Sequence, residues 1–211
     1  NRYREGVLDG LILKAETYLS NGEFILAKKT LHTVIKRYPE EKSAHILMGV
    51  TNYYLKDYQK AIDNFKKVPA SNSNDIETML FLGKCYLNLG DYNSVISYSN
   101  LILEIEPRNS EAMSIKAKSL LSLGEKSAAL LLAKKALKLN PAENFAVDMM
   151  TNLLIADKNF DEAMAVIERA SGYSKSQVLD SQILDIKEKK EAFIKKKQEQ
   201  AKRLKELAQE A

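Results

Sequence analysis

Small and apolar side chains recur along this chain with a period of 34 residues. The clearest series has five equally spaced members: Ala27, Ala61, Val95, Ala129 and Ala163. A second series of small residues stands twelve positions earlier in each repeat: Ala15, Gly49, Gly83, Ala117 and Thr151. Small residues suit places where two helices approach closely, because larger side chains would push the backbones apart. The pattern therefore predicts pairs of amphipathic helices that bury their apolar faces by stacking on one another.

The period divides most of the chain into consecutive units without insertion. We expect a lead-in over residues 1–7, repeats over 8–177 and a C-terminal helix over 178–211. The five expected repeats are 8–41, 42–75, 76–109, 110–143 and 144–177. Glycine marks the turn between the two helices in three of them, at Gly22, Gly90 and Gly124.

Proline marks the ends of the units. Pro39, Pro107 and Pro141 follow the second helix, where a residue without a backbone N–H stops the helix. Pro69 lies four residues earlier in its unit than the others do in theirs. We therefore predict a shortened helix in the second unit and a longer loop over 69–75.

These units resemble the tetratricopeptide repeat. The third unit carries the resemblance most fully, with Gly83, Tyr86, Gly90, Tyr92 and Pro107 at the signature positions. The resemblance implies an all-α fold: a right-handed α-solenoid of about five helix-turn-helix repeats, followed here by a long C-terminal helix. It also implies a scaffold or adaptor that binds a peptide or helix of another protein in a concave groove, rather than an enzyme.

The same resemblance implies which side chains line that groove, on the first helix of each unit. The expected groove residues are Ile12, Ile46, Val50, Tyr53, Tyr54, Leu80, Lys84, Leu87, Lys118 and Leu121. An apolar strip in the second unit is typical of a binding surface, although packing within the helix stack would also explain it. Tyr53 and Tyr54 are adjacent and cannot both face the groove. Lys84 and Lys118 would attract a carboxylate of a partner or would be ordinary solvated lysines.

The sequence offers no constellation for catalysis. His32 and His45 lie in different units and have no metal-ligand spacing, and Cys85 has no companion cysteine. No glycine-rich phosphate loop is present. We therefore expect no enzyme activity, no cofactor and no metal site.

Charge is concentrated at the C-terminal end. The net charge of the chain is +4, and residues 187–211 hold nine lysines and arginines against five glutamates, which is also +4. Because these charges of opposite sign alternate, a solvated helix is favoured over a nucleic-acid-binding arm.

The C-terminal segment is expected to be helical and to have two parts. Val178, Leu179, Ile183 and Ile186 predict that 178–186 covers the apolar end of the fifth repeat. The remainder is expected to project, with four apolar side chains touching a partner or a second copy: Phe193, Ile194, Leu204 and Leu207.

The favoured function is thus a protein-binding scaffold within a larger complex, and the alternative is a structural protein that assembles with itself. No apolar run is long enough to span a membrane. Without a visible export signal, the predicted location is cytoplasmic. The chain begins with Asn1 rather than Met, so we expect a trimmed N-terminus, which leaves export and further repeats open.

Overall fold

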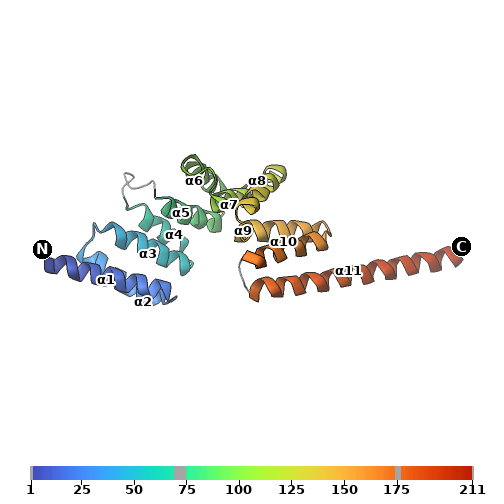
Figure 1. Cartoon of the computed structure of the whole chain (residues 1–211), viewed down its shortest axis with the longest axis horizontal. Helices are drawn as coiled ribbons and strands as arrows, with labels where there is room; N and C mark the ends of the chain where they lie inside the picture. Colours follow the sequence, from blue (N-terminus) through green and yellow to red (C-terminus); the bar gives the residue numbers. More distant parts are fainter. Residues whose placement is uncertain (1, 69–74, 174–176, 211) are drawn as a thin grey trace.

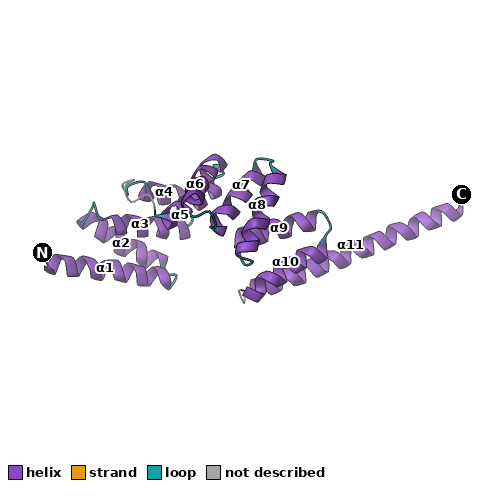
Figure 2. Cartoon of the chain, turned by 45° about the horizontal axis from the view of Figure 1, so that its top comes forward, coloured by secondary structure: helices purple, strands orange, loops and turns teal. Residues whose placement is uncertain are grey.

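The computed structural model describes residues 2–68, 75–173 and 177–210, and it describes the side chains of 6–68, 75–173 and 179–204. This part of the chain folds into eleven α-helices. Figure 2 shows these helices joined by loops, and no strand occurs among the described residues. The helices are α1 (Arg2–Ser20), α2 (Phe24–Arg37), α3 (Lys42–Tyr54), α4 (Tyr58–Phe65), α5 (Ile76–Leu89), α6 (Tyr92–Ile105), α7 (Ser110–Ser122), α8 (Lys126–Leu139), α9 (Asn144–Ala156), α10 (Phe160–Tyr173) and α11 (Gln177–Glu210). The predicted all-α solenoid is confirmed.

Helices α1 to α10 form five antiparallel pairs arranged as an arch, with α11 leading away from it (Figure 1). The first helices of units two to five begin at Lys42, Ile76, Ser110 and Asn144, which are 34 residues apart. The lead-in expected over 1–7 is instead helical from Arg2 onward and forms part of α1.

The turn inside each pair repeats with the same period. Positive φ angles occur at Gly22, Lys56, Gly90, Gly124 and Lys158, one in each unit. This left-handed conformation reverses the chain between antiparallel helices and is easiest for glycine. Two units place lysine there, so the fold imposes a backbone conformation that the local residue does not favour.

Polar side chains fix the start of three first helices, α3, α5 and α7. The side chains of Glu41, Asp75 and Asn109 accept hydrogen bonds from backbone N–H groups of the following turn. The donors lie two or three residues further on, as at other helix N-termini. Helix α4 spans only eight residues, so the shortened helix of the second unit is confirmed. Of the expected loop, 69–74 lies outside the described residues.

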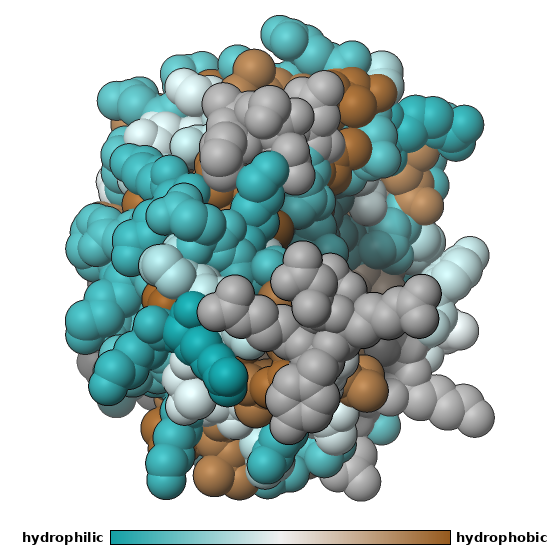
Figure 3. Space-filling view, turned by 90° about the vertical axis from the view of Figure 1, so that its left-hand side faces the viewer, coloured by the Kyte–Doolittle hydropathy of each residue, from teal (hydrophilic) through white to brown (hydrophobic). Residues whose placement is uncertain are grey.

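The core runs along the length of the solenoid as a series of connected clusters. All five members of the Ala27 series are fully buried. Gly49 and Gly83 lie where a Cβ atom would meet the side chain of Phe65 or Ile115. These contacts explain why small residues recur at 34-residue intervals. Seen from its amino-terminal end, the surface is largely hydrophilic with separate apolar patches (Figure 3).

Helix α11 packs on α10 over a longer stretch than we predicted. Ile186 is buried, and Leu179 and Ile183 pack beside it, but Phe193 also contacts the Phe160 ring at 5.7 Å between centroids. The covered part therefore ends near Phe193, not at 186. Seven residues return the helix to nearly the same face, so Phe193 follows Ile186 onto α10. The side chain of Val178 lies outside the described residues.

Candidate protein-binding surface

The first helices of the units lie on the inner side of the arch. Consecutive first helices contact one another, from α1 to α9, whereas the described second helices make no comparable contacts among themselves. Elements on the shorter, inner arc of a curved stack crowd together, and those on the outer arc spread apart. Figure 1 agrees, with α6 and α8 on the outer side at the top of the arch.

Aromatic rings from three units meet where the C-terminal end of α3 approaches α2 and α5. Tyr54 stacks on Phe24 with 4.9 Å between ring centroids and an angle of 6° between planes. Tyr53 lies edge-on to Phe81 at 5.3 Å, and Tyr54 is 6.4 Å from the same ring. We call these four residues, Phe24, Tyr53, Tyr54 and Phe81, the aromatic cluster. Their contacts connect α2, α3 and α5.

The two adjacent tyrosines of the cluster have different environments. Tyr53 is half-buried beside Tyr58 and Phe81, and burial raises the pKa of its phenol to about 12. Tyr54 is 49 % exposed, although one face of its ring is covered by Phe24. Tyr54 is therefore the member of the pair that a binding partner could reach.

The other predicted groove residues divide into two groups. Ile12, Ile46, Val50 and Leu121 are partly buried and pack against the core clusters while keeping some exposed surface. Leu80 and Leu87 are only 9 % exposed and belong to a cluster with Ile102 and Ile115. Their assignment to an open groove was wrong, because α7 covers the face of α5 on which they lie.

The two predicted lysines make contacts within the chain. Lys84 forms an ion pair with Glu111 of the next unit and lies over the Phe81 ring, 4.9 Å from its centroid. Lys118 lies over the Phe145 ring at 5.1 Å. The Lys84–Glu111 ion pair connects α5 to α7, and the Lys118–Phe145 contact connects α7 to α9. Lys84 is therefore engaged internally, whereas Lys118 stays exposed on the same face.

A buried carboxyl group, that of Glu143, lies near Lys84 and was not predicted. Ser114 Oγ donates a hydrogen bond to Glu143 Oε1 at 2.9 Å, and only 8 % of Glu143 is exposed. Burial raises the pKa of the Glu143 carboxyl, and nearby Glu111 adds to that effect. Glu143 ends the fourth unit in the sequence, a position at which no pattern pointed to burial.

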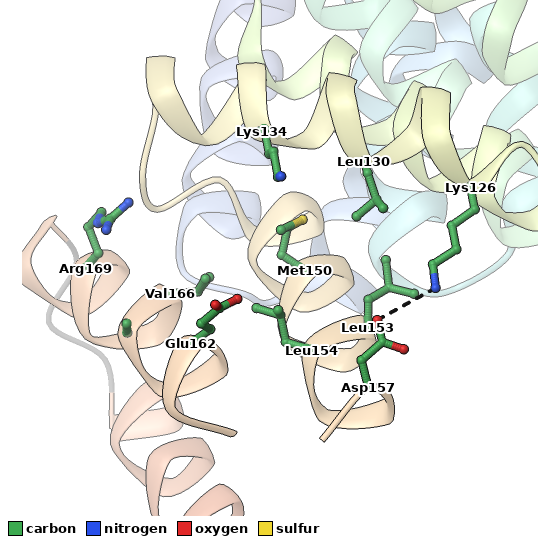
Figure 4. A pocket seen from close by; sticks show the side chains of 11 residues that line it. Lys126, Leu130, Lys134, Met150, Leu153, Leu154, Asp157, Glu162, Val166 and Arg169 are labelled. Carbon is green, nitrogen blue, oxygen red and sulfur yellow. Dashed lines mark ion pairs between the residues drawn. The ribbon is translucent and has the colours of Figure 1, made fainter. Parts of the chain in front are cut away.

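A hollow of about 330 Å³ opens between α8, α9 and α10 and was also not predicted (Figure 4). Leu130, Met150 and Leu153 are among its apolar lining residues, and charged side chains surround them. Lys126 reaches Asp157 at 3.8 Å across one end. The residues expected to line a groove all come from first helices, whereas the second helices α8 and α10 supply much of this lining.

The residues of the C-terminal helix that were predicted to touch a partner differ in how exposed they are. Part of the Phe193 ring is covered, because it packs on the Phe160 ring. Ile194 and Leu204 are 42 % and 67 % exposed on the projecting part of α11. The side chain of Leu207 lies outside the described residues.

Cys85 and His45, which the sequence offered as candidates for chemistry, are both buried. Cys85 is fully buried, and burial raises the pKa of its thiol to about 12, so it is protonated near neutral pH. His45 is buried with Nε2 2.7 Å from the Pro39 carbonyl, as a structural histidine would be. No group of three or more potential ligands could hold a metal ion in the part of the chain described. No described helix is both long and apolar enough to cross a membrane.

Solved structures of low sequence identity share this fold. The tetratricopeptide repeat protein TTC0263 of Thermus thermophilus aligns with a TM-score of 0.69 at 17 % identity, over 85 % of this chain and 98 % of that one. PilF of Pseudomonas aeruginosa aligns with a TM-score of 0.66 at 16 % identity, over 90 % of each chain. YrrB, described as a tetratricopeptide repeat protein with an unusual peptide-binding site, gives 0.57 at 17 % identity, over 84 % of this chain and 90 % of that one.

These similarities confirm the tetratricopeptide fold and, at such identities, nothing more specific. A search of curated protein sequences finds no match. The model of one protein family, described as the coatomer epsilon subunit, matches residues 44–210, which is most of the chain. The protein is therefore a tetratricopeptide-type α-solenoid that belongs to the coatomer epsilon subunit family.

Proposed function

We propose that this chain is a protein-binding subunit of a larger assembly, and that a peptide or helix of its partner lies on the inner face of the arch across the aromatic cluster. The family is described as a subunit, which supports a role inside a complex. The repeat fold supports protein interaction in general. No catalytic role is proposed, and the cytoplasmic location stays a prediction from the sequence.

The exposed ring of Tyr54 is the observation that carries this proposal. It is held in one orientation by Phe24 and bordered by Phe81, so a partner that covers it has little conformational entropy to remove. Tyrosine is enriched at the centres of protein interfaces, since its ring buries a large area while its hydroxyl can form a hydrogen bond. The neighbouring Ile46 and Val50 add partly exposed apolar surface.

Tyr54→Ser is the variant that tests the proposal. Val50→Asp is less informative, because Val50 packs beside Phe65 and Phe81 and a carboxylate there would also disturb the fold. An anchor residue contributes about 2 kcal/mol or more to binding, so Tyr54→Ser should weaken partner binding by about 30-fold. Leu131→Ser is the matched control, because Leu131 is 60 % exposed on the second helix α8.

The experiment first captures the partner from extract with the unaltered chain and then measures its affinity for both variants. Circular dichroism checks that helix content is unchanged. Equal affinity for Tyr54→Ser and the unaltered chain would show that the partner uses another surface. Light scattering that reveals concentration-dependent growth of the chain alone would favour the self-assembling alternative.

A further inference from the structure

The face of α11 that packs on α10 extends past the point at which α10 begins. Ile183, Lys190, Lys197 and Leu204 follow each other at seven-residue intervals and therefore lie along nearly one side of the helix. The first half of this stripe is covered by α10. The second half has no described helix of this chain against it, and Figure 1 shows α11 projecting alone.

The covered half shows what kind of helix this face accepts. Phe160 of α10 packs on Phe193, and Ala163 and Ile167 pack near Ile186. Beside these apolar contacts, Asp161 pairs with Lys190 at 2.5 Å. The partner of α11 within the chain is thus a helix with an apolar face and an acidic residue at its edge.

The uncovered half repeats the apolar and basic features without the acidic partner. A hollow of about 430 Å³ beside Phe193 is lined by Lys158, Ala192, Phe193, Lys196, Lys197 and Gln200. The ammonium groups of Lys197 and Lys158 lie 5.5 Å and 5.9 Å from the Phe193 centroid. Three lysines and no acidic side chain line this hollow, and Leu204 is exposed one heptad beyond Lys197.

We infer that the distal half of α11 binds an acidic amphipathic helix of a partner protein. This bound helix would lie on the same face of α11 as α10, next to the beginning of α10. Apolar residues of that helix would cover Phe193 and Leu204, and its carboxylates would pair with Lys196, Lys197 and Lys158, as Asp161 pairs with Lys190. This surface is separate from the aromatic cluster and does not depend on it.

Charge argues against a second copy of the arm as the occupant. Residues 194–210 hold six lysines and arginines against three glutamates, so two such arms repel each other. The glutamates and the apolar stripe likewise distinguish the arm from a dense phosphate-binding segment. The experiment that follows also tests these two alternatives, a second copy of the arm and a nucleic acid.

A fluorescent synthetic helix tests the inference directly. The probe is a peptide of about 18 residues, enough to span the distal half of α11, with leucines on one face and glutamates flanking them. Its counterpart carries lysine in place of every glutamate. Fluorescence anisotropy with the full chain should show that the acidic peptide binds at least about tenfold more tightly than the basic one. Added salt should weaken that binding.

Charge-reversal variants locate the site. Lys196→Glu with Lys197→Glu should weaken binding of the acidic peptide by about tenfold or more, whereas Lys29→Glu with Lys36→Glu, the same charge change on α2, should alter it less than about twofold. Tyr54→Ser should leave it unchanged, which separates this surface from the concave one. The inference is overturned if the acidic peptide does not bind at roughly 1 mM. Equal effects of the two charge reversals, a preference for a single-stranded RNA oligonucleotide, or self-association through the arm would also overturn it.

Discussion

Replacing Gly49 with alanine tests the packing that makes the repeat possible. An added Cβ would lie 2.5 to 2.7 Å from three atoms of the Phe65 ring. That ring is 3 % exposed and lies against the Phe81 ring at 6.0 Å, so it cannot swing away freely. Overpacking of this kind costs about 1–3 kcal/mol, and the better helix propensity of alanine returns about 1 kcal/mol. The difference is at most about 2 kcal/mol, and because the Phe65 ring is confined we expect a net loss in the upper half of that range, about 1–2 kcal/mol.

Two other glycines of first helices provide the comparison. In Gly83→Ala the nearest atom is the terminal methyl of Ile115 at 2.9 Å, which can move, so little net change is expected. In Gly10→Ala nothing lies within 4 Å, so the helix propensity alone should stabilise the protein by about 1 kcal/mol.

Urea unfolding followed by circular dichroism measures the whole series. The expected order of stability is Gly10→Ala, then the unaltered chain and Gly83→Ala, then Gly49→Ala. A thermal scan of Gly49→Ala should show a Tm about 2–8 °C below that of the unaltered chain. Replacing Phe65 with leucine should reduce the cost of Gly49→Ala, since the clashing ring is then absent. If Gly49→Ala is as stable as Gly83→Ala, the close approach of α3 and α4 at this point is not as the structure shows.

Three further predictions concern single side chains. Lys56→Gly should stabilise the protein against urea by about 0.5–1 kcal/mol because it relieves a φ of 61°, and a loss of stability would contradict that reasoning. Ser99→Ala should raise the free energy of unfolding by about 1 kcal/mol, because the buried Ser99 hydroxyl has no hydrogen-bond partner. A calorimetric measurement that shows a less stable variant would refute this. Glu143→Gln should stabilise the protein near neutral pH but not at acid pH. The pKa of the Glu143 carboxyl is raised in the folded state above its ordinary value of 4.5. The contribution of Glu143 to the free energy of unfolding therefore falls as the pH rises from 4.5 through the folded-state pKa. Urea unfolding at about pH 4 and about pH 8 measures the difference in free energy of unfolding between Glu143→Gln and the unaltered chain. The same difference at both pH values would contradict a raised pKa for Glu143.

The fold could be predicted from the sequence because the repeat is a packing requirement. Ala27 and its equivalents are small where helices meet, and the period that they define also locates the turns at Lys56 and Lys158, which lack the expected glycine. The extent of the α11 contact was underestimated, although the seven-residue step from Ile186 to Phe193 could have indicated it.

The candidate site was less predictable, because periodicity tells which face a residue occupies but not how far a neighbour covers it. Leu80 and Leu87 occupy groove positions and are nevertheless buried. Phe24 begins a second helix, yet its ring reaches Tyr54 of the next unit. The Ser114–Glu143 hydrogen bond joins residues 29 positions apart, a pairing that only the stacked units reveal.

Hydrogen–deuterium exchange of the chain, alone and in complex with its captured partner, tests the central claim most directly. Bound protein should slow exchange at amides near exposed binding surface, especially in the frayed ends of helices. We predict protection centred on the C-terminal half of α3, the start of α2 and the facing part of α5, where the aromatic cluster lies. Protection confined to the outer helices α4, α6 and α8, with none around Tyr54, would contradict the account.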